Sequence, residues 1–366
     1  YQGAMVSARL MHIAAPHAEF QWNSPEELNP LDDHVFAKLK MLNIPPSPPS
    51  SDASFLRRVT LDLCGRLPTS ADLETFLTDQ VPDKRARVVD RLLQRPEFAE
   101  YWTKKWMDVL RVSRDSIQLA GAQAYQKWLR AKIAEDVSFA EIVTSLLTAE
   151  GESYGNPEVN FYCVPPTPKT VTDPLYLQKD LAESTAQLFL GVRLQCAQCH
   201  NHPFERWTQD DYLSLAAFFT QVKRTRLGKA GPSGRPDRRQ MAIAVDLKAG
   251  ELAPTGWEGS VRPHFPGEEG LEIVEGSDRR RALADWLVAP GNRFFAKAVA
   301  NRVWYHLHGR GVVEPVDDMR ISNPPTNGPL LNGLAKRFVE SKFDLRAIVR
   351  DICQSRVYQL SAKPNS

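Results

Sequence analysis

The residues with the most specific chemistry in this chain are Cys196, Cys199 and His200, which form a Cys-x-x-Cys-His motif. In a helical turn, two thiols at this spacing can both reach one edge of a porphyrin and form thioethers with its two vinyl groups. The adjacent imidazole of His200 can then ligate the iron. The motif therefore predicts a covalently bound haem c, held by Cys196 and Cys199, with His200 as the proximal iron ligand.

Three other uses of the same side chains compete with haem. A zinc ion could be bound by the two thiols with His200 or His202, but structural zinc usually takes its second ligand pair from a distant segment. The sequence has no second Cys-x-x-Cys and no His-x3-His. A thioredoxin-type dithiol follows a strand, whereas a helical pattern precedes this motif, and reduced, inert thiols are the simplest interpretation. Haem is favoured, and zinc is kept as the alternative cofactor.

The second axial position of the iron has one leading candidate. His202 is too near His200 in sequence to reach the opposite face of the same iron, so we expect it at the ring edge or on a propionate. His306 lies on an apolar helical face with Val299 and Val303. A core histidine is the simpler interpretation, but a distal ligand would occupy the same kind of position, and an open sixth position fits equally well. The weaker candidates are Met241, His264, His308 and Met319.

The composition excludes several classes of protein. The chain has 366 residues, 42% of them hydrophobic, and no uninterrupted apolar run long enough to span a membrane. Its formal net charge is +2, and its basic stretch at 224–239 lies among glycines and prolines, where a solvated loop is expected. We therefore expect no nucleic-acid partner. The sequence also lacks a Gly-x-Ser-x-Gly motif, a phosphate loop and a dinucleotide fingerprint.

The remaining cysteines bear on the compartment. Cys64, Cys163 and Cys353 are an odd number of scattered thiols, so we expect buried small side chains rather than a disulfide framework. Covalent haem attachment in bacteria takes place outside the cytoplasm, which predicts a periplasmic or secreted protein. No signal peptide is visible, and the opening Tyr1–Met5 is typical of what a cleaved tag and cloning site leave.

Helical patterns dominate the chain. Apolar residues recur every three or four positions, and Ser, Thr or Asp precedes many of these runs as a helix cap. An aromatic stripe that includes Trp102 and Trp106 is more typical of a helical core than of a cofactor wall. A turn-rich loop is expected at 149–173, and strands at 241–245 and 271–274. The expected helices are 32–41, 51–63, 69–77, 83–93, 96–110, 122–135, 139–148, 175–192, 208–219, 277–289, 294–308, 329–341 and 345–355.

The expected fold is mainly α, with two helical subdomains and a small Gly/Pro-rich insert that contains β-strands. A chain of this length usually exceeds one hydrophobic core. We expect a tag remnant and extended arm at 1–30, an N-terminal helical domain at 31–223, a linker or small β module at 224–276, and a C-terminal helical domain at 277–366. The haem motif is expected between two buried helices.

Several longer segments resemble a known pair of domains. The chain is similar to the paired domains of unknown function that recur in secreted planctomycete proteins, often fused to planctomycete-type cytochrome c domains. This resemblance implies an exported protein with a c-type haem and no established reaction. Both His202 and His306 fall on the family's pattern, whereas His308 and Met319 depart from it. The matching segments are 55–63, 65–69, 189–193, 195–204, 210–212, 216–219, 283–287, 301–304, 306, 309–311, 314–318, 322–325 and 355–360.

These observations predict an extracytoplasmic mono-haem c-type cytochrome that transfers electrons to or from a redox partner protein, or carries out redox chemistry at the iron. One alternative is a zinc-stabilised module that binds a surface polymer or a protein partner. Another is a haem peroxidase or oxidase, because a chain of 366 residues is far longer than electron carriage by one haem requires.

Overall fold

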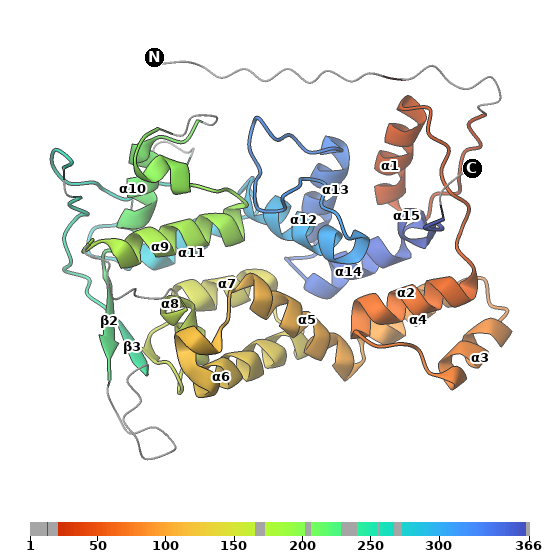
Figure 1. Ribbon diagram of the computed structural model, residues 1–366, viewed down its shortest axis with the longest axis horizontal. Helices are drawn as coiled ribbons and strands as arrows, with labels where there is room; N and C mark the ends of the chain where they lie inside the picture. The colour runs from red at the N-terminus through yellow and green to blue at the C-terminus, as the bar shows by residue number, and fades with distance from the viewer. Residues whose placement is uncertain are drawn as a thin grey trace. The chain divides into compact units, whose positions relative to one another are not determined.

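A computed structural model describes residues 13, 21–164, 173–201, 206–227, 240–254, 256–266 and 273–363. Within this part of the chain, fifteen α-helices and one three-stranded sheet form the regular structure (Figure 1). The prediction of a mainly α protein with a little β-structure is therefore confirmed. The position of His202 lies outside the described residues, as do 271 and 272 of the expected strand at 271–274.

The helices follow the expected order along the chain. Most begin or end within a few residues of the positions expected from their apolar periodicity. Their bounds are α1 Pro30–Met41, α2 Asp52–Cys64, α3 Ser70–Thr78, α4 Lys84–Leu93, α5 Pro96–Val109, α6 Arg114–Ala134, α7 Phe139–Leu147, α8 Asn160–Cys163, α9 Tyr176–Thr185, α10 Gln209–Ala217, α11 Arg279–Leu287, α12 Phe295–His308, α13 Gly328–Glu340, α14 Leu345–Gln354 and α15 Arg356–Gln359.

The sheet joins segments that are far apart in the sequence. Its strands are β1 Gly151–Glu152, β2 Val222–Arg226 and β3 Met241–Val245, in the order β1-β3-β2. Both pairs are antiparallel, with Val222 opposite Val245 and Gly151 opposite Ile243. The strand at 241–245 was predicted correctly. The strand β2 was not, because only its first residue is buried and its charged side chains give no alternating apolar pattern.

Two local predictions were wrong. The expected loop at 149–173 contains β1, a short 3-10 helix at Pro157–Val159 and α8; its glycines and prolines mark turns between short elements instead of one long loop. The expected helix at 175–192 ends its α-helical part at Thr185 and continues as one π-helical turn, Ala186–Leu190, that stops at Gly191. Gly191 has φ 69°, a left-handed conformation that glycine adopts without strain.

Contacts divide the chain into two compact units, which we call unit 1 and unit 2. Among the described residues, unit 1 includes those of Thr103–Phe295 and Arg320–Ser322, whereas unit 2 includes 21–102, Ala296–Met319 and 323–363. These units depend on which helices pack together and do not follow sequence order. The expected domains at 31–223, 224–276 and 277–366 are bounded by composition along the chain and stay a prediction.

Unit 1 is organised around packed aromatic and aliphatic side chains. Trp106 packs on Phe139 with their rings 4.3 Å apart, and Phe139 stacks on Phe295 at 6.3 Å. Arg280 is fully buried and is neutralised by Asp278, with a second hydrogen bond to the carbonyl of Ala149. A buried guanidinium is tolerated because it is paired and hydrogen-bonded.

Unit 2 brings the two ends of the described chain together. Phe55 of α2 lies edge-on to Tyr358 of α15, with ring centres 6.4 Å apart, and both are buried. The aromatic stripe of α5 is core, as predicted, since Trp102 and Trp106 are 0% and 2% exposed. Each of these indoles lies in a different unit.

Local capping sets several helix boundaries. The Thr69 side chain accepts from the backbone N–H of Asp72 while the Asp72 carboxylate accepts from the Thr69 N–H, a capping box that starts α3. The helix α2 ends at Gly65, where φ is 67° and a Cβ would lie 2.4 Å from the Tyr101 ring. Only glycine fits both the conformation and the space.

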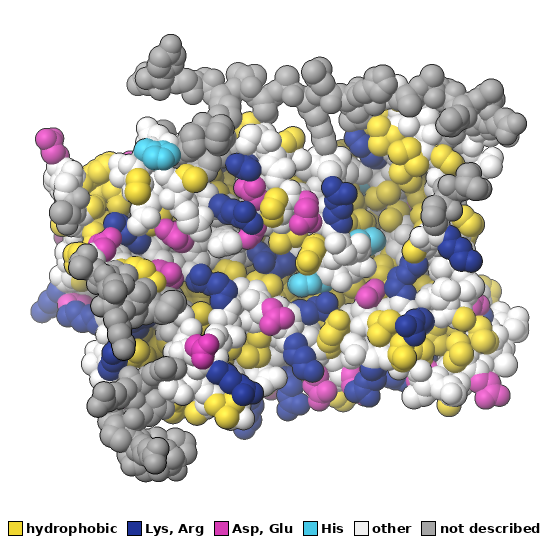
Figure 2. Space-filling model, viewed as in Figure 1, with side chains coloured by type: hydrophobic (Ala, Val, Ile, Leu, Met, Phe, Trp, Pro, Cys, Tyr) yellow, Lys and Arg dark blue, Asp and Glu magenta, His cyan; other side chains and the backbone are white. Residues whose placement is uncertain are grey.

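Figure 2 shows basic and acidic side chains interspersed on the face that it views, as the near-neutral net charge implies. Among the described residues, none of the helices combines the length and the apolar character needed to cross a bilayer. Cys64, Cys163 and Cys353 are buried free thiols, as predicted.

Candidate functional site

The Cys-x-x-Cys-His segment begins as a short 3-10 helix in unit 1. This helix covers Gln195–Gln198, and Cys199 follows at φ −110°, ψ −24°. Side chains three positions apart in a 3-10 helix lie above one another, roughly 6 Å apart along the axis. Cys196 and Cys199 therefore lie on one side of the turn, and both are exposed.

The opposite side of the turn anchors it to the unit. Leu194 and Ala197 are buried, at 2% and 0% exposed, and the Ala197 N–H donates to the Leu194 carbonyl at 2.8 Å. A single turn thus separates two buried aliphatic side chains from two exposed thiols. The arrangement holds the backbone in place while the thiols remain accessible.

Helix α10 fixes the position of the turn through Gln209. The Gln209 side-chain amide donates to the Gln198 carbonyl at 3.0 Å, and the Gln209 backbone N–H donates to Asn201 Oδ1 at 3.0 Å. The start of α10 is set by a capping box in which Thr208 and Asp211 exchange hydrogen bonds. A defined helix start therefore holds the middle of the motif and the residue that follows it.

His200 has a defined tautomer in this arrangement. Its Nδ1 lies 2.8 Å from the Asn201 carbonyl oxygen. A carbonyl only accepts hydrogen bonds, so Nδ1 must carry the proton and donate. The exposed ring consequently keeps its lone pair on Nε2, the atom that a metal would use.

A buried tryptophan lies beside the motif. Trp207 is 4% exposed, and its indole Nε1–H has no hydrogen-bond acceptor in the described part of the chain. The ring packs on Phe294 at 6.0 Å, and the Arg206 guanidinium lies over it at 4.6 Å. A buried donor without an acceptor costs free energy, so this indole is held in the unit by its packing alone.

An acidic pair on α9 was not singled out from the sequence. Tyr212 of α10, which is fully buried, donates its hydroxyl to Glu183 Oε1 at 2.8 Å, and Asp180 lies one helical turn before Glu183. Burial raises the pKa of Glu183, although the hydrogen bond from Tyr212 opposes the shift. Burial also raises the pKa of Asp180, against the nearby Arg111 guanidinium. Two carboxyls one turn apart on the same helix were the available signal.

Two family models match this chain. A family model described as PSCyt2, protein of unknown function (DUF1549), matches residues 30–224, which include the motif and the helices that hold it. The chain belongs to this family. A second model, PSD1, protein of unknown function (DUF1553), matches residues 279–366. The resemblance to a pair of domains of unknown function is thereby confirmed. No match was found among curated proteins or among solved structures.

The two family matches leave residues 225–278 between them. This interval contains β3, and it overlaps almost completely with the expected Gly/Pro-rich insert at 224–276. The PSCyt2 match contains Cys196, Cys199 and His200, whereas His306 lies in the PSD1 match. The predicted site residues are thus distributed over both families.

The structure brings three of the predicted residues together. Cys196, Cys199 and His200 share one exposed turn of unit 1, whereas His306 belongs to unit 2, where its ring lies edge-on to Trp102 at 6.1 Å. His306 as a second axial ligand therefore stays a prediction. His202 lies outside the described residues, so its placement at a haem edge also stays a prediction.

The weaker candidate ligands have ordinary surroundings. His264 Nε2 lies 3.3 Å from Asp210 Oδ2, and His308 stacks on Trp304 with the ring centres 3.8 Å apart. Met241 is the first residue of β3 and is 8% exposed.

The residues around the motif suit a covalently attached haem. Both thiols lie on one side of a turn, and the Nε2 lone pair of His200 is available one residue later. A zinc site would need at least three nearby ligands, and the described residues contain no group of three His, Cys, Asp or Glu side chains placed to hold a metal ion. Zinc stays a prediction that would require His202.

Proposed function

We propose that this chain is an extracytoplasmic c-type haem protein that exchanges electrons with a partner protein. Cys196 and Cys199 would hold the haem, and His200 would be its proximal ligand. The observation that carries the proposal is the placement of both thiols on the exposed side of one 3-10 turn, whose other side is anchored by Leu194 and Ala197.

Each motif residue has a distinct part in the proposed attachment. The S–H group of each cysteine would add across a vinyl C=C bond, so that one C–S and one C–H bond form and nothing leaves. The Asn201 carbonyl holds the His200 ring in the tautomer that leaves Nε2 free. When bound, the haem would accept and release one electron.

The exposure of the motif favours electron exchange over catalysis in a closed site. Both thiols and the His200 ring reach solvent, so the attached edge of the ring would lie at the surface, where a partner can approach closely. A peroxidase or oxidase needs an open iron face in a pocket that admits a small substrate and excludes other reactants.

A pyridine haemochrome spectrum tests the cofactor. The chain would be exported in a host that carries the c-type maturation machinery, and then purified under denaturing conditions. We expect about one covalent haem per chain for the native sequence and for the control Cys64→Ser, and no covalent haem for the double variant Cys196→Ser/Cys199→Ser.

Two outcomes would contradict the proposal. If the native protein folds under these conditions but carries no covalent haem, the proposed haem attachment is wrong. Stoichiometric zinc by elemental analysis, with no Soret absorbance, would favour the zinc-stabilised binding module instead.

The second axial ligand has a separate test. If His306 is the distal ligand, His306→Ala changes the spectra of both oxidation states and lets cyanide bind rapidly. The control is His264→Ala, whose imidazole contacts Asp210. Unchanged spectra in His306→Ala would show that His306 is not a ligand, and rapid turnover of peroxide by the native protein would favour a peroxidase.

A further inference from the structure

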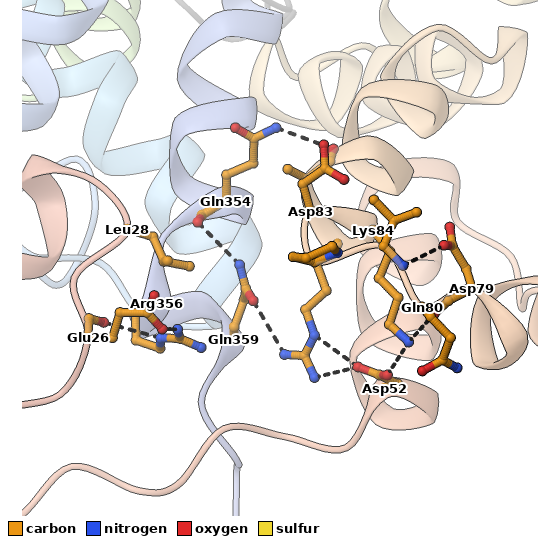
Figure 3. Close-up of a pocket in the computed structure, with 14 residues that line it drawn as sticks. Glu26, Leu28, Asp52, Asp79, Gln80, Asp83, Lys84, Gln354, Arg356 and Gln359 are labelled. Atoms are coloured by element: carbon orange, nitrogen blue, oxygen red, sulfur yellow. Dashed lines mark hydrogen bonds and ion pairs between the residues drawn. The ribbon is translucent and has the colours of Figure 1, made fainter.

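Unit 2 contains a cleft that plays no part in the proposed haem chemistry. Its volume is about 690 Å³, within the range of small-molecule sites. Four segments of the chain line it: the arm at 26–28, the first residue of α2, the loop and first turn of α4 at 79–86, and residues 354–359. Figure 3 shows polar side chains from these segments directed toward one another across the cleft.

Five of the charged groups of the cleft are paired with one another, whereas Asp79 and Asp83 pair with Arg87 outside it. Arg85 donates to Asp52 Oδ1 through Nε at 3.0 Å and Nη2 at 2.7 Å, and Lys84 Nζ lies 2.7 Å from Asp52 Oδ2. Arg356 forms an ion pair with Glu26. Burial alone would raise the pKa of Asp52, but the hydrogen bonds from Lys84 and Arg85 hold it below its usual value.

Amide side chains extend this network across the cleft. Gln359 Oε1 accepts from Arg85 Nη1 at 3.3 Å, while Gln359 Nε2 donates to the Gln354 carbonyl at 3.2 Å (Figure 3). Gln354 Nε2 in turn donates to the Ala86 carbonyl at 3.3 Å. Hydrogen-bond donors and acceptors therefore alternate along one wall of the cleft, which we define as Asp52, Lys84, Arg85, Gln354 and Gln359.

The wall is held in place before any ligand arrives. Lys84 Nζ also donates to the carbonyls of Phe76 and Asp79, at 3.3 and 3.0 Å, and lies over the Phe76 ring. Side chains fixed in this way lose little conformational freedom when a ligand binds. The cleft is thus pre-organised for hydrogen bonding.

The charge balance indicates which ligands suit the cleft. Its lining has four carboxylates, Glu26, Asp52, Asp79 and Asp83, against three cationic side chains. These carboxylates would repel an anionic ligand, and the guanidinium and ammonium groups would repel a cationic one. A neutral ligand avoids both conflicts and can still use the paired charges, since a carboxylate offers about four acceptor positions.

The rim of the cleft supplies a small apolar surface. Leu28 and Val81 line it and are each 42% exposed, with Pro82 beside Val81. Hydroxyl-rich rings present C–H groups on their faces and hydroxyls at their edges. Such a molecule would pack its C–H face on the aliphatic rim and hydrogen-bond with the polar wall.

We propose that this cleft binds a neutral, hydroxyl-rich ligand of the saccharide class. A vicinal pair of hydroxyls donates and accepts at adjacent positions, which matches a carboxylate beside a guanidinium or amide. A peptide is a poorer match. Its side chains need defined apolar pockets, and the described lining offers only Leu28, Val81, Pro82 and Ala86 as apolar side chains.

The test uses the full chain and a panel of neutral oligosaccharides of two to four units, of the cello-, xylo-, manno- and malto- series. Immobilised panels identify binders, and titration calorimetry measures their affinity. We expect saturable binding of at least one series. Val81→Arg places a long side chain at the rim and should weaken binding at least tenfold.

Leu77→Arg is the matched control, because Leu77 of α3 is 44% exposed and does not line the cleft. It should bind like the native chain. Asp83→Asn is a second variant that should weaken binding. We expect this variant to fold, because the Asp83 side chain makes no cap hydrogen bond. Thermal unfolding of every variant checks that the fold is retained.

Three results would overturn the proposal: no saturable binding of any oligosaccharide in the panel, binding that Val81→Arg leaves unchanged, or tighter binding of phosphate or of a lysine-rich or apolar tripeptide. The experiment uses protein that has not been exposed to the haem maturation machinery. Its failure is therefore distinct from a failure of the proposed electron transfer.

Discussion

Two histidines of this chain show how surroundings determine the chemistry of a side chain. His200 is exposed, and a neighbouring carbonyl sets its tautomer. His308 is enclosed between Trp304, at 3.8 Å, and Tyr358, whose ring lies edge-on at 5.8 Å. Burial lowers the pKa of His308 to about 4. The His308 imidazole is therefore a neutral group packed between aromatic rings, whereas the His200 imidazole is exposed.

Acid should destabilise the protein through His308. Its pKa is lower in the folded chain than the ordinary value of 6.5, so the stability that it contributes is complete above pH 6.5 and is lost as the pH falls toward 4. Between pH 7.5 and 4.5, protonation of this group alone lowers the free energy of unfolding by about 2 kcal/mol. Urea unfolding should show that the free energy of unfolding falls less between pH 7.5 and 4.5 in His308→Phe than in the native protein, by the same amount. Equal sensitivity would contradict the prediction.

Glu183 should show the opposite pH dependence. Burial raises its pKa, so folding favours the protonated form, and the associated stability is lost as the pH rises through the folded-state pKa. Glu183→Gln keeps an acceptor for the Tyr212 hydroxyl and removes the charge. Urea unfolding should therefore show the variant more stable than the native chain at pH 8 and about equal at pH 4. The exposed control Glu141→Gln should show no such difference.

At the scale of elements, helix starts position the candidate site. The capping box of Thr208 and Asp211 places Gln209 so that it holds Gln198, within the motif, and Asn201, directly after it. A similar capping box, Thr69 with Asp72, starts α3 in unit 2. The two boxes have the same local chemistry, but only one of them adjoins the motif.

This difference can be measured. Thr208→Ala and Thr69→Ala should each lower the free energy of unfolding by about 1 kcal/mol. Only Thr208→Ala should accelerate amide hydrogen exchange at 195–201, because α10 then holds Gln209 less firmly. The proposed coupling of α10 to the motif would be wrong if both variants left exchange in this segment unchanged.

At the scale of the whole molecule, one buried carboxylate joins the N-terminal and C-terminal segments of unit 2. Asp32 of α1 is 0% exposed and accepts from four backbone N–H groups. Two belong to Leu28 and Asn29, at 2.8 and 3.2 Å, and two to Arg356 and Val357, each at 2.9 Å. One side chain therefore joins segments more than three hundred residues apart in sequence.

Loss of this carboxylate should destabilise unit 2 strongly. Asp32→Ala leaves four donors without their acceptor, and we expect a loss of about 3 kcal/mol or more in the free energy of unfolding, because hydrogen bonds to charged groups contribute about 1.5 to 3 kcal/mol each. The neighbouring exposed residue provides the control, Asp33→Ala, which should change stability by about 0.5 kcal/mol or less. Chemical unfolding monitored by tryptophan fluorescence would distinguish the two variants. Similar small effects of both would contradict a closing role for Asp32.

The sequence by itself determined the local features of this protein. The order of the helices, the strand at 241–245, the buried Trp102 and Trp106, and the resemblance to the paired families all follow from periodicity, caps and motifs. These signals are local because backbone geometry and capping energies involve residues within a few positions of one another. The Cys-x-x-Cys-His chemistry is local for the same reason.

Only the tertiary structure decided which segments pack together. Composition predicted domains in sequence order, whereas Phe55 packs with Tyr358 and Asp32 bonds to Val357 in unit 2. The Asp180–Glu183 pair and the cleft lined by Asp52, Lys84 and Gln359 likewise became visible only in the fold. Such sites depend on side chains from distant segments meeting in space, and the one-dimensional pattern of apolar and polar residues does not specify which helices pack together.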